Sequence, residues 1–220
     1  MPEDEIFRVT LPPGRHHLPR DFVEQHQRAR LVAAIVALVD EQGYPATSLA
    51  QVVKKAGVAR HTFYEHFEDK EALFLAVFGE ATERALRTAQ VAAEAEDGTW
   101  EAQLRAGVAA LLADMAKDPA LARVVLIEAQ SAGLAVLVRY EEAMQAFAAL
   151  LRAGRERDPR RAQVPDSLEE ILIGGAIWMV VTRLSNDPDS IEELCPGLVE
   201  FLIAPYLGRE TAREVRQQQG

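Results

Sequence analysis

Apolar side chains recur every three to four residues along most of this chain, and segments in which apolar and polar positions alternate are almost absent. The first spacing places apolar side chains on one face of a helix, whereas alternation would indicate a strand. Between residues 20 and 42, for example, Val32, Ile35, Val36 and Val39 form one face, and Gly43 then ends the helix. The pattern therefore predicts an all-α protein.

About nine helices are predicted, separated by proline, glycine or charged residues. They span residues 20–42, 48–56, 60–66, 70–93, 100–117, 119–131, 134–155, 167–185 and 191–206. We expect a flexible arm at residues 1–20, which are rich in proline, and a polar tail at residues 208–220. Between them we predict an N-terminal domain at residues 21–80 and a helical body at residues 81–207.

The second and third predicted helices are short and are separated by only three residues. Ser48 and Gln51 form the sequence pattern of a capping box at the start of the first one. Gly57, in the turn, tolerates the positive φ that a tight turn requires. Two short helices joined in this way and packed on a longer first helix form a helix-turn-helix. Its second helix presents its first residues, here Arg60 and His61, to the edges of DNA bases.

The stretch from Thr47 to Phe74 resembles the DNA-binding signature of the TetR family of transcriptional regulators. The strongest matches are, in order, Ala56-Gly57-Val58, Thr62-Phe63-Tyr64, His66-Phe67 and Lys70-Glu71-Ala72-Leu73. The resemblance covers residues 21–80 closely and the remaining chain in outline. It implies an all-α homodimer that binds a palindromic operator in double-stranded DNA. It also implies a repressor that a small molecule releases from this operator.

The resemblance also implies roles for individual residues. Arg60, His61 and Thr62 match base-reading positions, and Tyr64 matches a position whose hydroxyl reaches a phosphate. Ala59 departs from the family, which often has serine there, and it forgoes a helix cap of about 1 kcal/mol. The expected DNA contacts are Thr47, Ser48, Lys55, Arg60, His61, Thr62, Tyr64, His66 and Lys70.

Blander roles remain open for several of these residues. Tyr64 and His66 fit simple packing positions, and Lys54 and Lys55 fit a solvated helix face. The basic residues of the N-terminal arm either enter a minor groove or have no function in binding.

The resemblance implies a dimer interface formed by the last two predicted helices and the same helices of a second copy. The interface residues expected from it are Ile171, Gly174, Gly175, Trp178, Val181, Leu194, Leu198, Phe201 and Leu202. Each mid-helix glycine costs roughly 1 kcal/mol relative to alanine, which a close approach between helices would justify. The alternative is that both helices belong to the core of one protomer.

A ligand pocket is expected between the middle helices of the body. The candidate lining residues are Leu104, Val108, Leu111, Met115, Val125, Glu128, Tyr140, Met144, Phe147 and Trp178. The apolar ones fit a plain core equally well. Glu128 interrupts an apolar run, so it either contacts a cationic ligand group or lies at the surface. This composition favours a small organic effector that is apolar or amphipathic.

Charge and the rarer residues narrow the class of protein. The net charge is −10, but residues 1–70 carry nine Lys/Arg against ten Asp/Glu, so residues 71–220 hold most of the acidity. The single cysteine, Cys195, excludes an intramolecular disulfide and fits a cytoplasmic protein, and the apolar runs are too short to span a membrane. No histidine follows residue 66, so we expect no metal site in the body and no cofactor.

These observations bear on three kinds of function. A ligand-released repressor is the main hypothesis, and a ligand-independent or activating regulator of the same fold is the alternative within that class. A helical small-molecule-binding protein without DNA binding is an alternative of another class. An enzyme is not expected, because the chain lacks a nucleophile elbow, a P-loop and a dinucleotide fingerprint.

Overall fold

The computed structural model describes residues 20–155, 165, 167–208 and 212, and all of its regular elements are helices. The α-helices are α1 (Arg20–Gln42), α2 (Leu49–Ala56), α3 (Arg60–His66), α4 (Lys70–Glu94), α5 (Trp100–Lys117), α6 (Pro119–Leu126), α7 (Leu134–Arg155), α8 (Leu168–Asn186) and α9 (Cys195–Leu207). Two 3₁₀-helices, η2 (Glu128–Ser131) and η4 (Pro188–Leu194), lie between them. The prediction of an all-α fold is confirmed.

Four of the described α-helices start after a residue whose side chain caps them. Ser48 and Gln51 form the expected capping box at α2, and Asp69 accepts the backbone N–H of Ala72 at α4. Thr99 and Asp118 cap α5 and α6 in the same way. Each such cap satisfies a backbone N–H that the first helical turn leaves without a partner, and this stabilises the helix by about 1 kcal/mol.

Two predicted helices are each split in the structure. The segment predicted as one helix at 119–131 consists of α6 and η2, with Ile127 between them at φ −106° and ψ −55°. The segment predicted at 191–206 begins as part of η4 and becomes α-helical only at Cys195. Pro196 explains the second break, because proline lacks an N–H and fits only the first turn of a helix.

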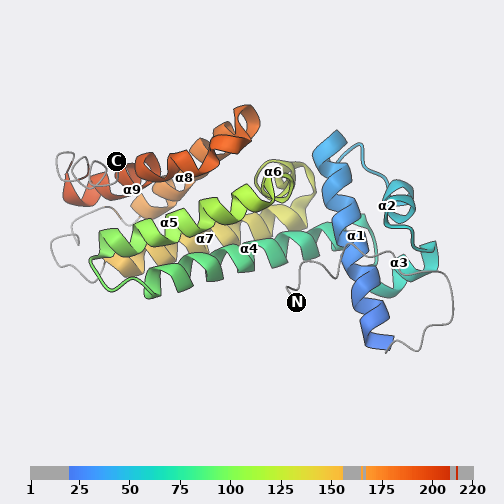
Figure 1. Ribbon diagram of the computed structural model, residues 1–220. Coiled ribbons are helices and arrows are strands. Elements are labelled where there is room, and N and C mark those ends of the chain that lie inside the picture. Colours follow the sequence, from blue (N-terminus) through green and yellow to red (C-terminus); the bar gives the residue numbers. More distant parts are fainter. Residues whose placement is uncertain (1–19, 156–164, 166, 209–211, 213–220) are drawn as a thin grey trace.

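Figure 1 shows a small group of helices at one end of an elongated molecule. We call α1, α2, α3 and the first half of α4 the head, and the second half of α4 with α5 to α9 the body. The long α4 runs from the head along the body beside α5 and α7, and α6 lies next to α1 at the junction (Figure 1). The predicted boundary between residues 80 and 81 falls inside α4, so one continuous helix belongs to both parts.

Two apolar cores correspond to these parts. The first is built around Phe63, Phe74 and Phe78, which are almost fully buried between α1, α3 and α4 and reach α6 and α7. The second lies between α5, α8 and α9 and includes Leu112, Leu184 and Ile203. No described helix is long and apolar enough to cross a membrane. Of the predicted arm at residues 1–20, only Arg20 is described, as the first residue of α1, and most of the predicted tail at 208–220 lies outside the described residues.

Candidate functional site: a helix-turn-helix surface and an apolar cavity

The turn between α2 and α3 has the geometry that the sequence predicts. Gly57 has φ +61° and ψ +36°, which is the left-handed region that favours glycine. The guanidinium of Arg30, on α1, donates a hydrogen bond to the carbonyl of Gly57 at 3.1 Å. The turn is therefore tied to α1, and the angle between α2 and α3 is fixed relative to the rest of the head.

Helix α3 is held by one buried face and leaves the other exposed. Phe63 is fully buried, and its ring lies 5.9 Å from that of Phe67. Arg60, His61 and Tyr64 occupy the exposed face. No side chain caps the start of α3, as the alanine at position 59 predicts. The exposed face thus presents a cation, an imidazole and a phenol, which are groups that bind base edges and phosphates.

Arg60 and Tyr64 contact each other on this face. The guanidinium lies 5.8 Å from the centre of the Tyr64 ring, and it donates a hydrogen bond to the Tyr64 hydroxyl at 3.3 Å. The two residues are one helical turn apart, so the contact restricts both side chains without distorting the helix. Arg60 is therefore oriented along the exposed face before any DNA arrives.

Several of the expected DNA contacts have a structural role instead. Thr47 and Thr62 are only 2% and 6% exposed, and the Thr47 hydroxyl donates to the carbonyl of Gly43 at 2.9 Å. Neither threonine side chain faces solvent, so the expectation that Thr62 reads a base does not fit this structure. His66 is half-buried, and its Nε2 atom is enclosed without a hydrogen-bond partner. Ser48 and Lys55 are exposed on α2, where phosphate contact remains a prediction.

Lys70 also points into the protein. Its ammonium donates to the carbonyls of Tyr44 and Thr47 at 2.9 and 2.7 Å and lies 3.8 Å from the centre of the Tyr44 ring. Burial lowers the pKa of Lys70 from its ordinary value, while the two carbonyl partners favour the charged form. Lys70 thus joins the start of α4 to the loop before α2, a role that the sequence did not reveal.

The junction between head and body contains a second set of polar contacts. Arg123, on α6, donates two hydrogen bonds to the carboxylate of Asp40, on α1, at 2.7 and 2.8 Å. These hydrogen bonds are the main reason that the pKa of Arg123 is raised. Beside this pair, the carboxylate of Glu128 accepts the backbone N–H of Tyr44 at 2.9 Å. Glu128 therefore ties η2 to the end of α1 and is neither a pocket residue nor a free surface charge.

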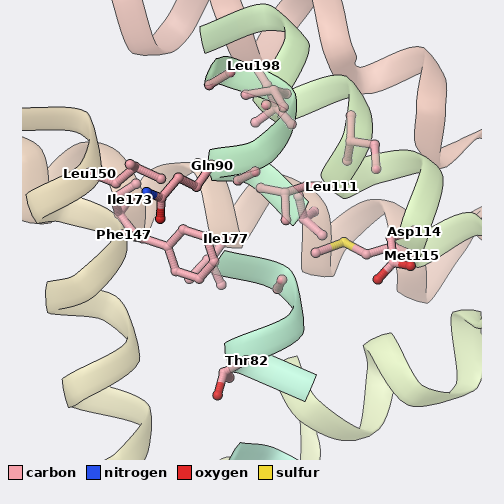
Figure 2. A pocket seen from close by; sticks show the side chains of 18 of the residues that line it. Thr82, Gln90, Leu111, Asp114, Met115, Phe147, Leu150, Ile173, Ile177 and Leu198 are labelled. Atoms are coloured by element: carbon pink, nitrogen blue, oxygen red, sulfur yellow. The ribbon is translucent and has the colours of Figure 1, made fainter. Parts of the chain in front are cut away.

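The body contains a cavity of about 430 Å³ between α4, α5, α6, α7, α8 and α9. Four alanines on α4, at positions 81, 85, 89 and 93, form part of its wall. Residues four apart lie on the same face of a helix, so these short side chains leave space beside one face of α4 along its length. Figure 2 shows Leu111, Phe147 and Ile177 around the space, with Gln90 and Asp114 bringing polar groups to it.

Six of the ten predicted pocket residues line this cavity, and four do not. Those at the cavity are Leu104, Val108, Leu111, Met115, Val125 and Phe147. Tyr140 instead packs on Phe78, with 6.1 Å between ring centres, and Met144 lies outside the lining. Trp178 is 69% exposed on the outside of α8. The sequence pattern missed large residues such as Leu150 and Ile177. It also missed the alanines of α4, although their spacing of four is visible in the sequence.

The expected dimer residues fall into two groups. On α8, Ile171 and Trp178 are 65% and 69% exposed, and a side chain added at Gly174, between them, would meet no atom within 4 Å. On α9, Leu198 and Leu202 are buried within the protomer and line the cavity, which does not favour an interface role for either. Gly175 faces α9, because a Cβ there would lie 2.6 Å from the Phe201 ring. Phe201, Leu194 and Val181 are half-buried.

The described residues contain no group of three or more histidine, cysteine or carboxylate side chains placed to hold a metal ion.

The geometry defines a class of protein: an all-α protein with a helix-turn-helix head and a body that contains an apolar cavity. Residues 31–77 match the family described as bacterial regulatory proteins of the tetR family. The HTH-type transcriptional regulator AcrR of Shigella flexneri is 40% identical over 50 residues, which are 23% of each chain. The head is therefore a DNA-binding domain of the TetR type.

Longer matches cover the body as well. The fatty acid metabolism regulator protein of Bacillus subtilis (strain 168) is 21% identical over 181 residues, 80% of this chain and 93% of that protein. The structure of the fatty acid degradation regulator FadR from Bacillus halodurans is similar with a TM-score of 0.69 at 22% identity, covering 79% of this chain and 96% of that one. The structure of FadR from Bacillus subtilis in complex with stearoyl-CoA gives a TM-score of 0.67 at 21% identity, covering 81% and 97%. At these identities the structural matches establish the fold of the body.

Proposed function

We propose that this regulator is a homodimeric repressor that a long-chain apolar or amphipathic effector releases from a palindromic operator. The observation that carries the proposal is the physical connection between the exposed face of α3 and the cavity. Helix α4 begins directly after α3 and forms a wall of the cavity. An occupant of the cavity that prefers one position of α4 therefore biases the position of the head.

Helix α6 supplies a second connection. Ala122 and Val125 line the cavity, whereas Arg123 between them holds Asp40 of α1. Successive helical residues point in different directions, so one short helix contacts the effector site on one side and the head on the other. A shift of α6 on effector binding would act on the head through the two charge-assisted hydrogen bonds of Arg123.

The exposed stripe on α8 supports the dimer in this proposal. Ile171, Gly174, Trp178 and Val181 lie on one side of the helix at spacings of three and four residues. Exposed apolar patches of this kind mark interaction sites on soluble proteins, and the small Gly174 permits a second helix to come close. A two-fold interface here would place two copies of α3 on the same side of a DNA duplex and would match a palindrome.

The chemistry of the cavity supports an effector with a long apolar part. Apolar side chains dominate the lining, and the cavity follows α4 from Ala81 to Glu94. A rise of about 1.5 Å per residue makes this stretch roughly 20 Å long, which suits an extended aliphatic chain. The stearoyl-CoA named for the Bacillus subtilis FadR complex carries such a chain.

Selection of duplexes from a random pool by the full-length protein tests DNA binding. We expect a palindromic consensus, and an affinity that falls about 10³–10⁵-fold between 50 and 200 mM salt if the dimer makes roughly 6–10 phosphate contacts. Arg60→Ala should relax the sequence preference at one base in each half-site by about 1–3 kcal/mol. Failure to enrich any sequence would favour the alternative of a small-molecule-binding protein without DNA binding.

A further inference from the structure

The charged residues around the cavity are mostly acidic. Among the described residues that line it, four are ionisable: Arg84, Glu94, Asp114 and Asp118. One cation therefore faces three carboxylates. A ligand with a carboxylate or phosphate at its polar end would bring a further negative charge to this wall.

The one cation in this lining is already paired. The Nε atom of Arg84, on α4, donates to Asp114, on α5, at 3.1 Å, and the Asp114 side chain is 24% exposed. An anionic ligand would have to share the guanidinium of Arg84 with Asp114, and the Arg84 side chain is 50% exposed. Sharing this cation with a carboxylate weakens the binding of an anion, because an anion that leaves water needs a compensating partner in the protein.

Three other polar side chains of the lining also donate hydrogen bonds within the protein. The Thr82 hydroxyl donates to the carbonyl of Phe78 at 2.9 Å, and the Gln90 amide donates to Glu94 at 2.8 Å. Gln103 donates to a backbone carbonyl at 3.2 Å. The carboxylates of Glu94, Asp114 and Asp118 each accept one of the hydrogen bonds described above and keep further lone pairs that accept hydrogen bonds.

We infer that the effector is a long-chain amphiphile whose polar end donates hydrogen bonds and carries no negative charge, of the alcohol or amine class. The inference rests on the proposed function, since it specifies the occupant of the effector cavity. It separates this protein from a regulator that responds to an acyl-CoA, whose phosphates require cations. The aliphatic chain lies along the alanines of α4, and the polar end meets the carboxylates of Asp114 or Glu94.

Displacement of Nile red, a neutral apolar dye, from the full-length protein tests the inference. The competitors are four ligands with the same twelve-carbon chain: dodecanol, dodecylamine, dodecanoate and dodecanoyl-CoA, each kept below the concentration at which it aggregates. We expect dodecanol or dodecylamine to bind at least about tenfold more tightly than dodecanoate and dodecanoyl-CoA. Equal or tighter binding of either anion overturns the inference.

Two variants test where the ligands bind and whether Asp114 causes the preference for ligands without a negative charge. Asp114→Asn frees Arg84 from its carboxylate partner, so dodecanoate should bind about tenfold more tightly and dodecylamine more weakly. Ala85→Leu places a larger side chain in the wall of the cavity and should weaken binding of all four ligands. Its matched control is Ala109→Leu, at an exposed position of α5 outside the lining. An unchanged affinity of Asp114→Asn for dodecanoate, or unchanged binding by Ala85→Leu, contradicts the inference, and thermal melting checks that each variant is folded.

The same assay separates the inference from the function beneath it. If the anions bind best and also release the protein from its selected duplex, the charge preference is wrong and the effector-released repressor stands. If no ligand of the series binds and Nile red is not retained, the inference and the proposed effector cavity fail together, whereas the DNA-selection result stands on its own.

Discussion

The head and the body of this protein differ in how their functional features are made. In the head, specific polar groups hold backbone atoms in place: Arg30 binds the turn at Gly57, and Lys70 binds the carbonyls of Tyr44 and Thr47. In the body, the cavity lies along a face of α4 that carries alanines. The helix-turn-helix surface therefore depends on polar side chains that bind the backbone, whereas the cavity depends on positions where the side chain is small.

This difference predicts opposite responses to substitution. Interiors are packed as densely as organic crystals, so removing atoms from the core of the head leaves a void that the fold cannot fill. Adding atoms to the cavity of the body removes space that the fold already leaves empty. Stability should therefore be most sensitive in the head, and ligand binding should be lost in the body without loss of the fold.

The largest effect is expected from Phe63→Ala. Phe63 is 0% exposed and packs α3 against the first core, so truncation should lower the free energy of unfolding by about 3–5 kcal/mol. Urea unfolding of this variant, compared with Ala85→Leu, measures the contrast. A similar loss in both variants would show that the body is as tightly packed as the head.

The next largest effect is a difference in stability between substitutions of two lysines of the head. Lys70→Met removes an ammonium that binds two carbonyls and should destabilise the protein by about 1.5–3 kcal/mol. Lys55→Met, on the exposed face of α2, should change stability by less than about 0.5 kcal/mol. DNA binding should show the reverse ranking, with the salt dependence of the Lys55→Met variant reduced by about one phosphate contact. A stable Lys70→Met protein would remove the structural role assigned to this residue.

The junction between head and body is tested by a double-mutant cycle on Asp40→Asn and Arg123→Met. Both side chains are partly exposed, at 22% and 31%, so we expect an interaction energy of about 0.5–3 kcal/mol for stability. Ligand affinity of the free protein should change little, while the concentration of ligand needed for DNA release should rise. Fluorescence anisotropy of a labelled duplex follows that release, and an unchanged release curve would exclude this pair from the connection.

The smallest effect distinguishes the two adjacent glycines of α8. Gly174→Ala should stabilise a protomer by about 0.5–1 kcal/mol, because alanine is the better helix former and its Cβ meets no atom within 4 Å. Gly175→Ala should destabilise it, because the new Cβ would lie 2.6 Å from the Phe201 ring. Thermal melting compares the two variants.

A larger side chain at position 174 then tests the proposed interface. Gly174→Leu should convert the dimer to monomers in sedimentation analysis and lower operator affinity. A dimer that survives this change would place the interface elsewhere on the molecule.

The sequence predicted the helices and the helix-turn-helix well, because those features depend on local patterns. Capping residues, a glycine in the turn and one apolar face per helix are all visible within about 28 residues, and the structure has them at Ser48, Gly57 and Phe63. The two misplaced helix boundaries arose at Ile127 and Pro196, where a 3₁₀ turn continues the helical periodicity.

The functional residues of the body were harder to predict, because cavity and core have the same composition. Leu111 and Phe147 line the space while Tyr140 and Met144 do not, and only the packing of α4 against α5, α7 and α8 decides between them. Contacts between distant residues were also hidden. Neither the pairing of Arg123 with Asp40 nor that of Glu128 with the N–H of Tyr44 has a local signature.

The connection between cavity and operator is tested most directly by measuring the same coupling from both sides. Calorimetry gives the affinity of the tightest twelve-carbon ligand for the protein alone and for the protein saturated with its selected duplex, and anisotropy gives the affinity for the duplex with and without that ligand. Because coupling between two binding sites is reciprocal, the account predicts that each partner weakens the other by the same factor, between about 5-fold and 150-fold. Identical ligand affinities with and without DNA would contradict it.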